Sequence, residues 1–440
     1  MILTLKNIGK IKDARVELNG ITVIAGENNT GKSTVGKILF SIFNSFYKVD
    51  EQIYREKRNI IGKTLINMTE IPRHRLRSSS SLNELIDNIL ESIDEHNSEM
   101  NSLSDLLKET LMDDIDIDND IEESIFEDIA RRILQIISIP EQEIFKELLS
   151  ENLNEEFNNQ INNIFFDDED GVVELDIKGT IIKILVQDNR IIDIRQNISL
   201  NTEAIYIDDP FVLDDVRPVR IIPPFFRMEN YTNHRLHLQS KLRNIREDFG
   251  IEDAINKIIA TKKIEDIISK MNTVFRGEMI KVSNIRFGYR EVNTDKILDI
   301  KNLSTGLKTF VILKTLLLNG TIQDKGTIIL DEPEIHLHPE WQILFAEIIV
   351  LLQKEFNMHI LLNTHSPYFL RAIQVYSAKY EIADKCNYYL AENVEDKAII
   401  RDVTTDIDEI YAKLAKPFER LEVERYSDDW YSGIWYFYKK

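Results

Sequence analysis

The chain has 440 residues, 43% hydrophobic and 29% charged, which is enough apolar material for a sizeable core in two or three domains. This composition excludes disordered, collagen-like and disulfide-scaffold proteins. The single cysteine, Cys386, cannot form an intrachain disulfide and favours a reducing compartment. The N-terminus lacks the apolar core of a signal peptide, and no apolar run approaches the roughly 20 residues of a membrane span. We therefore predict a soluble cytoplasmic protein with no membrane partner.

The formal net charge of −21 is concentrated in one segment. Residues 81–170 contain 27 acidic and 4 basic residues, whereas the rest of the chain contains 48 acidic and 50 basic residues. The total charge therefore argues neither for nor against nucleic-acid binding by the body of the protein.

The beginning of the chain predicts three strands followed by a helix. Apolar and polar residues alternate over 2–7 and 12–18, and the continuous apolar run 21–25 is typical of a buried strand. A helical pattern starts at Lys32 and ends near Tyr47. The polar, mildly basic stretch that follows shows no clear periodicity.

The acidic segment predicts amphipathic helices, because apolar residues recur there at offsets of three and four. The three series are Leu82, Leu85, Ile86, Ile89, Leu90 and Ile93; Ile121, Ile125, Ile129 and Ile133; and Phe145, Leu148, Leu149 and Leu153. Pro140 separates the last two helices, because proline can open a helix but not continue one. We predict a helical, acidic insertion over 48–168 that divides the body of the protein into residues 1–47 and 169–440.

The rest of the chain first follows the strand period and then alternates helices with strands. Strands are predicted over 172–177, 180–186, 191–196, 204–207 and within 279–300. Helices are predicted over 229–275, 305–318 and 340–356, and further strands over 327–330 and 359–363. The C-terminal 70 or so residues are mixed, and the aromatic tail 430–440 is expected to be core or oligomer interface.

A phosphate-binding loop is the strongest motif. Residues 26–33, GENNTGKS, match G-x-x-x-x-G-K-[ST] after a predicted buried strand and at the start of a predicted helix. Backbone N–H groups of such a loop surround the β- and γ-phosphates, Lys32 supplies a positive charge, and Ser33 offers a hydroxyl to Mg²⁺. The residues expected to contact the nucleotide here are Gly26, Asn28, Asn29, Thr30, Gly31, Lys32, Ser33 and Thr34. We therefore predict a site for a nucleotide with Mg²⁺.

Two further strand ends predict catalytic groups. The apolar run 327–330 ends in Asp331 and Glu332, so Asp331 is expected in the Mg²⁺ shell and Glu332 at the attacking water. His365 follows the strand predicted over 359–363, which can lie parallel to the first, so it is expected beside Glu332 and close to the γ-phosphate. The alternatives are a simple strand-end cap for the acids and a structural histidine.

The segment Leu303-Ser304-Thr305-Gly306 precedes an apolar helix. Ser304 is a good N-cap residue, and capping alone would explain it. The alternative is that Ser304 and the free N–H groups of the helix start form an anion site. The phosphate would then belong to a second subunit.

These elements, in this order, resemble the ATPase heads of the ABC class in the SMC/RecF-like branch. They resemble most closely the AAA-type ATPases of the overcoming-lysogenisation-defect (OLD) and Septu-like anti-phage systems. The matching residues are GENNTGKS as Walker A, LSTGLK as a divergent signature motif, ILDEPEIHLHPE as Walker B and D-loop, and NTHSP as H-loop. The resemblance covers about 1–46 and 170–380. It implies an α/β P-loop ATPase head with an antiparallel β subdomain, interrupted by the acidic insertion where relatives carry coiled coils or other arms.

The resemblance also implies a homodimer, or a higher homo-oligomer, that closes head-to-tail around ATP. Lys32 and Ser33 of one subunit would face Ser304 and Gly306 of the other, and the presence of Glu332 favours hydrolysis. The chain departs from the family in having Ser-Thr-Gly in the signature, as is usual in this branch. It also has Asp208 and Asp209 where a Q-loop glutamine is expected, and it lacks a recognisable OLD-type nuclease domain.

Weaker candidates stay open. Glu334, His336 and His338 could bind a metal, but packing of the D-loop is the favoured interpretation. Basic clusters at 55–77 and 217–246 could contact nucleic acid, although a solvated surface is the commoner explanation. The first cluster consists of Arg55, Lys57, Arg58, Lys63, Arg73, Arg75 and Arg77, and the second of Arg217, Arg220, Arg227, Arg235, Lys241, Arg243 and Arg246.

Three functional hypotheses follow. The first is an anti-phage ATPase switch that controls a separately encoded nuclease or toxin. The second is a RecF/SMC-like DNA repair or maintenance ATPase, and the third is a scaffold that holds ATP without turnover. A transporter motor fits poorly, given the long insertion and the His-Ser-Pro switch. The defence hypothesis rests on family analogy more than on site chemistry.

Overall fold

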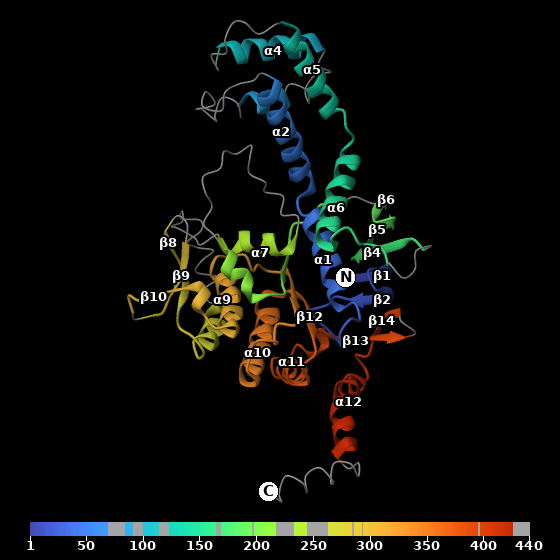
Figure 1. Cartoon of the computed structure of the whole chain (residues 1–440), viewed down its shortest axis with the longest axis vertical. Helices are drawn as coiled ribbons and strands as arrows, with labels where there is room; N and C mark the ends of the chain where they lie inside the picture. The colour runs from blue at the N-terminus through green and yellow to red at the C-terminus, as the bar shows by residue number, and fades with distance from the viewer. Residues whose placement is uncertain are drawn as a thin grey trace, which may run out of the picture.

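The computed structural model describes residues 1–68, 84–90, 100–113, 123–163, 169–195, 198–216, 233–243, 263–283, 286–292, 294–394 and 397–425. A helical arm rises from a body built on one large sheet, and the last described helix projects from the opposite side (Figure 1). Several residues named in the sequence analysis lie outside the described residues: Leu82, Ile93, Ile121, Arg73, Arg75, Arg77, Arg217, Arg220, Arg227, Arg246 and the tail 430–440.

The large sheet has eleven strands in the order β6-β5-β4-β1-β2-β14-β13-β3-β12-β11-β7. Its antiparallel half consists of β1 (Ile2–Ile8), β2 (Ile11–Glu17), β4 (Gly171–Ile177), β5 (Thr180–Gln187) and β6 (Arg190–Arg195). Its parallel half consists of β3 (Ile21–Gly26), β7 (Ala204–Ile207), β11 (Thr327–Asp331), β12 (His359–Thr364) and β13 (Cys386–Val394). The remaining strand, β14 (Lys397–Asp402), is antiparallel to β13 and parallel to β2 and so joins the two halves.

The burial of the strands agrees with their sequence patterns. Every residue of β3 is buried, as its continuous apolar run predicts for a strand covered on both faces, whereas β4 alternates buried and half-buried residues. Tight turns join β4, β5 and β6. Lys178 and Gly179 have φ values of 53° and 88°, and Asp188 and Asn189 have 49° and 61°, as two-residue hairpin turns require. The strands predicted at the N-terminus and in this meander are thus confirmed.

A C-terminal hairpin lies in the middle of the sheet, which the sequence did not predict. β13 and β14 insert between β2 and β3, with Cys386 paired to Ile21 and Ala391 paired to Gly26. This pairing joins opposite ends of the chain. No local pattern predicts such a distant partner. The C-terminal region, whose pattern is mixed, therefore supplies two central strands of the sheet.

Helices cover both faces of the parallel half. α9 (Thr305–Leu318), α10 (Pro339–Phe356) and α11 (Pro367–Lys379) share one hydrophobic cluster with alternate residues of the strands, and α1 (Lys32–Phe46) shares a second cluster with the others. In β11, for example, Ile328 belongs to the first cluster and Ile329 to the second. The helices predicted over 32–47, 305–318 and 340–356 are confirmed, whereas α11 was not predicted from the sequence.

The body has further helices and a second, smaller sheet. They are the 3₁₀ helices η1 (Pro210–Asp215), η3 (Ile300–Asn302) and η4 (Ala383–Lys385), the helices α7 (His234–Arg243) and α12 (Asp408–Arg425), and a small antiparallel sheet of β8 (Glu278–Ser283), β9 (Arg286–Arg290) and β10 (Ile297–Asp299). Of the helix predicted over 229–275, the described parts are α7 and a helical stretch at 263–271, and residues 272–275 are not helical.

The arm consists of α2 (Val49–Met68), α4 (Met100–Asp113), α5 (Glu123–Ile137) and α6 (Glu141–Phe157). α2 leads away from the body and α6 leads back to it (Figure 1). The tip has a hydrophobic cluster of its own: Ile61, Leu65, Leu85, Ile86, Ile89, Leu90, Leu103, Leu107, Phe126, Ile129, Ala130, Ile133 and Ile136. α6 instead buries Phe145, Leu149 and Leu153 in the body, and Pro140 is its N-cap residue. Among the described residues, no helix has the length and apolarity to cross a membrane.

Candidate functional site

The phosphate-binding loop connects β3 to α1, as the sequence predicts. Gly26 and Gly31 have φ values of 153° and 81°, and a Cβ at Gly26 would lie 2.0 Å from the carbonyl oxygen of Ala391, while one at Gly31 would lie 2.6 Å from Ile11. Both positions therefore require glycine for backbone conformation and for close approach to the neighbouring strands. The tight fit against β13 shows that the C-terminal hairpin supports this loop.

The predicted contact residues of the loop do not all face the same way. Asn28, Asn29 and Ser33 are exposed at the crest and at the helix start, and Thr34 is half-buried. Thr30 is buried, and its hydroxyl donates a hydrogen bond to the carbonyl of Glu27 at 2.8 Å. Thr30 therefore offers a ligand its backbone N–H rather than its side chain.

Lys32 is buried beneath the loop. Its Nζ donates hydrogen bonds to the carbonyl oxygens of Glu27 at 2.7 Å and Gly26 at 3.4 Å. Burial lowers the pKa of Lys32, whereas the nearby charges of Glu332 and Asp331 oppose that shift. The three charged groups thus share one electrostatic environment, although they come from distant parts of the sequence.

Asp331 ends β11 with its carboxylate held by two donors. The Tyr206 hydroxyl donates to Oδ2 at 2.9 Å, and Asn363 Nδ2 donates to Oδ1 at 2.8 Å. Tyr206 lies on β7 and Asn363 on β12, the two strands that flank β11. Because both neighbours hold the carboxylate, its direction is set by the sheet itself.

Glu332 and His365 come together as the sequence predicts. β11 and β12 are parallel neighbours, and Glu332 Oε1 is in close contact with His365 Nε2, an ion pair when the imidazole is protonated. This contact, with the charge of Lys32, lowers the pKa of Glu332 against the effect of partial burial. Glu332 has a φ of 50°, a conformation that costs a non-glycine residue on the order of 1 kcal/mol. Its backbone N–H donates to the carbonyl of Asn363 at 3.0 Å, which stabilises the turn.

Glu334 holds the segment around His365, a role that sequence reasoning missed. It is buried, and its Oε1 accepts hydrogen bonds from the Thr364 hydroxyl, from the His365 N–H at 3.0 Å and from the Ser366 N–H at 3.3 Å. Burial raises the pKa of Glu334, and these donors counteract the rise. The sequence feature that could have predicted this role is an acidic residue two positions after Glu332. It lies in a turn that packs against the segment following β12, where backbone N–H groups need an acceptor.

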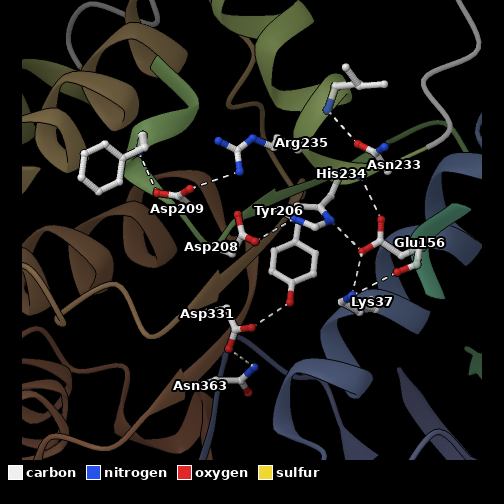
Figure 2. Close-up of polar contacts among 12 residues, drawn as sticks. Lys37, Glu156, Tyr206, Asp208, Asp209, Asn233, His234, Arg235, Asp331 and Asn363 are labelled. Atoms are coloured by element: carbon white, nitrogen blue, oxygen red, sulfur yellow. Dashed lines mark hydrogen bonds and ion pairs between the residues drawn. The ribbon is translucent and has the colours of Figure 1, made fainter. Parts of the chain in front are cut away.

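A polar network beside Asp331 was also missed (Figure 2). The Tyr206 ring stacks on the His234 ring with centroids 4.5 Å apart, and His234 lies between two carboxylates. Its Nδ1 is 2.6 Å from Glu156 Oε1 and its Nε2 is 2.9 Å from Asp208 Oδ2. Burial alone would lower the pKa of His234, but hydrogen bonds with Asp208 and Glu156 raise it to about 9. The signal for this network was Tyr206 itself, because a tyrosine in a buried strand needs a partner for its hydroxyl.

The two aspartates in the place of the Q-loop have structural partners. Asp208 pairs with His234, while Asp209 accepts a hydrogen bond from the N–H of Phe211 at 2.8 Å and pairs with Arg235. Neither carboxylate has a partner in the phosphate-binding loop among the described contacts. We therefore assign no Q-loop function to them.

The signature segment starts α9 with an exposed Ser304. Ser304 occupies the N-cap position, but its side chain makes no capping hydrogen bond, so the capping interpretation is wrong for its hydroxyl. A Cβ at Gly306 would lie 2.8 Å from the carbonyl oxygen of His336, so this glycine permits close packing on the D-loop. Lys308 is buried and pairs with Asp214 of η1 at 2.7 Å, which anchors the helix start.

The weaker metal site is not supported. Glu334 points to the H-loop, His336 packs edge-on against Phe211, and His338 caps α10 by accepting from the Glu340 N–H. Among the described residues, no group of histidines, cysteines and carboxylates has the arrangement of a metal site. The D-loop packing interpretation is favoured by these contacts.

Several described residues of the two basic clusters form ion pairs. Arg58 pairs with Asp87, Lys241 with Glu203, and Arg235 with Asp209 and Asp215. Within the described residues, these clusters therefore offer less uncompensated charge to a phosphate backbone than the sequence alone indicates.

The donor set fits Mg²⁺ with a nucleotide. Asp331 offers a carboxylate and Ser33 an exposed hydroxyl, and hard oxygen donors of this kind, few in number, suit an ion that is otherwise held by phosphates and water. Bound there, Mg²⁺ would neutralise charge on the phosphate oxygens.

The architecture and the loop define a P-loop ATPase. The chain matches the AAA ATPase domain family over residues 1–370 and belongs to that family. The predictions of an α/β ATPase fold and of an AAA-type ATPase are thereby confirmed. The matched residues include the acidic arm, which lies outside the segments 1–46 and 170–380 that carry the motifs.

One relative and three solved structures show further similarity. The chain is 31% identical over 102 residues to the protein named "Retron Vc95 probable ATPase" of Vibrio cholerae serotype O1 biovar El Tor, over 21% of this chain and 19% of that protein. The matched part thus spans about a fifth of the relative. An SMC head domain from Thermotoga maritima has a TM-score of 0.38 at 11% identity, over 91% of this chain and 98% of that one. An SMC head bound to the C-winged helix domain of ScpA has 0.37 at 11% identity over 93% and 98%. An SMC head with an extended coiled coil, bound to the C-terminal domain of ScpA derived from Pyrococcus furiosus, has 0.34 at 12% identity over 96% and 98%.

Proposed function

We propose that this protein is an ATP-driven switch, in which two heads close head-to-tail on Mg-ATP and reopen after hydrolysis. The observation that carries the proposal is the contact between Glu332 and His365 beside Asp331 and Lys32. In this scheme the end of β11 supplies Asp331 as the magnesium-binding carboxylate and Glu332 as the group that polarises water. The end of β12 supplies His365 as the group that senses the γ-phosphate, beside the phosphate-binding loop that follows β3.

Each side chain has a defined task in this scheme. Lys32 neutralises the β- and γ-phosphates, while Ser33 and Asp331 hold Mg²⁺. Glu332 orients the attacking water, and its lowered pKa keeps it ionised as an acceptor for the water proton. His365, in contact with Glu332, donates to the γ-phosphate.

The signature segment supports closure by a second copy. Ser304 is exposed and makes no capping bond, so its hydroxyl and the first N–H groups of α9 are available to an anion. The phosphate-binding loop begins a different helix, so one subunit does not need both for the same phosphate. We infer that Ser304 and Gly306 face the γ-phosphate held by Lys32 of the other subunit.

The output of the switch is proposed to be a separate protein. Among the described residues, no group of histidines, cysteines and carboxylates has the arrangement of a metal site of the nuclease kind. The similarity to a retron ATPase supports a role in anti-phage defence, in which the closed dimer controls a separately encoded nuclease or toxin. The acidic arm is the surface proposed to meet that effector or a basic partner.

The test compares the solution mass of wild type and Glu332→Gln with and without Mg-ATP, with phosphate release measured in parallel. We expect the variant to form a stable ATP-dependent dimer and to release phosphate at least a hundredfold more slowly than wild type. Glu340→Gln removes the same charge from an exposed position on the neighbouring helix and should behave as wild type.

Other outcomes distinguish the alternatives. Unchanged mass together with no turnover in either protein would contradict the switch and favour a scaffold that holds ATP. Salt-dependent stimulation of turnover by DNA would instead favour a DNA-maintenance ATPase.

A further inference from the structure

The polar network in Figure 2 connects the base of the arm with the carboxylate proposed to hold Mg²⁺. We propose that Tyr206 is a positioning residue for Asp331, and that Glu156 at the end of the arm sets the position of Tyr206 through His234. This inference rests on the proposed function, because it assigns a regulation to the same nucleotide site.

The first step is the contact between Tyr206 and Asp331. The Tyr206 side chain is buried on β7, and its hydroxyl donates to Asp331 Oδ2 at 2.9 Å. A tyrosine hydroxyl is protonated at neutral pH and a carboxylate can only accept, so Tyr206 acts as the donor in this contact. With Asn363 on the other oxygen, Tyr206 decides which lone pairs of Asp331 stay available to a metal ion.

The second step is the ring contact between Tyr206 and His234. The two rings are stacked at 4.5 Å with an interplanar angle of 28°, and Phe40 of α1 packs against both. A displacement of His234 therefore displaces the Tyr206 ring, because packed aromatic rings leave no free space between them. The hydroxyl of Tyr206 would move with its ring.

The third step ties His234 to the arm. Glu156, in the last turn of α6, holds His234 twice: Oε2 accepts from the backbone N–H at 3.0 Å and Oε1 contacts Nδ1 at 2.6 Å. The Glu156 side chain is 1% exposed and that of His234 is 13% exposed, so water competes little for this contact. Lys37 of α1 also donates to the Glu156 carbonyl at 3.0 Å.

These contacts connect α6 to Asp331 through Glu156, His234 and Tyr206. α6 leads back from the arm to the body, and its Glu156 is the one described carboxylate of the arm that holds the first residue of α7. A shift of α6 on α1 would release His234 and loosen the Tyr206 hydroxyl from Asp331. A purely structural role would instead make Tyr206 and Glu156 matter for stability and leave the magnesium dependence of nucleotide binding unchanged.

The test measures binding of a fluorescent ATP analogue to the full chain during a Mg²⁺ titration, and separately in EDTA. Tyr206→Phe removes the hydroxyl and keeps the ring stack. We expect the free Mg²⁺ concentration for half-maximal tight binding to rise about tenfold, with affinity in EDTA unchanged. The matched control is Tyr389→Phe, a buried tyrosine of β13 whose hydroxyl accepts from the Glu17 N–H at 2.8 Å, and it should leave the magnesium requirement unchanged.

A second pair of variants tests the arm. Glu156→Gln should raise the Mg²⁺ requirement about threefold, because it acts through one more contact, whereas Glu155→Gln, an exposed neighbour on α6, should not change it. Thermal melting of each variant checks that the chain is folded.

The outcomes separate the two proposals. If Tyr206→Phe and Tyr389→Phe have the same magnesium requirement, the positioning role is wrong. If Tyr206→Phe raises the magnesium requirement and Glu156→Gln does not, the proposed role of Glu156 in positioning Tyr206 is wrong. If wild type binds no nucleotide with Mg²⁺, the proposed function itself fails and the inference falls with it.

Discussion

The body and the arm are stabilised by contacts of different range. The body pairs strands from both ends of the chain, such as β3 with β13, and buries its helices on the two faces of that sheet. The tip of the arm buries only residues of the arm, from Ile61 to Ile136, in a separate hydrophobic cluster. The comparison indicates that the arm tip can vary in stability without changing the nucleotide site, whereas the base of the arm cannot.

The helix α6 forms the junction between the two regions. Phe145 of α6 packs edge-on against Phe46 of α1, with ring centroids 4.6 Å apart, and belongs to a cluster of the body. Glu156 at the end of the same helix holds His234. α6 is thus the helix of the arm that packs on the body along most of its length.

The largest expected effect is a loss of stability on removing a buried phenylalanine, and it tests whether the arm and the body unfold independently. Phe126→Ala opens a cavity in the arm cluster and should destabilise the arm by about 4 kcal/mol, while ATP affinity stays within about twofold of wild type. Phe145→Ala, a substitution of the same size at an equally buried site, should destabilise the body as well. Hydrogen exchange resolved by segment measures both. Equal loss of protection in the sheet for Phe126→Ala would show that arm and body unfold as one unit.

A somewhat smaller change in free energy is expected for ATP binding at the phosphate-binding loop. Lys32→Ala removes the buried cation near Glu332 and Asp331, and should weaken ATP binding roughly a hundredfold, about 3 kcal/mol, with no loss of protection in the arm. Calorimetric titration with ATP is the measurement. Lys263→Ala removes a lysine that pairs with Asp324 at 2.6 Å, outside this network, and is the control, for which ATP affinity close to wild type is expected.

The junction between body and arm should depend on pH. The pKa of His234 is raised from an ordinary value of 6.5 to about 9, so the contact stabilises the fold fully below pH 6.5 and is lost as pH rises through 9. His234→Gln should therefore cost about 2 kcal/mol at pH 6, allowing for the partial exposure of Asp208, and much less near pH 9.5. Denaturant unfolding of both proteins across this range measures it. A difference that grows with pH would contradict the assignment.

The smallest effect is expected at the surface of the arm. Arg58 and Asp87 form a partly exposed ion pair, with oxygen–nitrogen distances of 2.8 and 3.1 Å. Asp87→Asn should change arm stability by about 0.5 kcal/mol or less, and this small difference should shrink further at high salt. Thermal melts at low and high ionic strength measure it. A loss comparable to that of Phe126→Ala would mean that charge, and not the apolar cluster, holds the arm together.

The sequence by itself determined the local elements and the chemistry at their ends. Periodicity located α9 at Thr305–Leu318, and the loop pattern located the glycines whose φ values and close approach the fold requires. The parallel placement of β11 and β12, which brings His365 to Glu332, followed from a single crossover helix. Such features are local, so neighbouring residues carry enough information to predict them.

Tertiary structure alone decided which distant groups meet. The insertion of β13 and β14 beside β3, the hydroxyl of Tyr206 on Asp331, and the carboxylate of Glu156 on His234 each join segments far apart in sequence. Each of these residues fits its own helix or strand whether or not the partner is present, so no local pattern predicts the contact. The partner is selected by sheet order and by the requirement that a buried polar group finds a hydrogen bond, and both are properties of the folded chain as a whole.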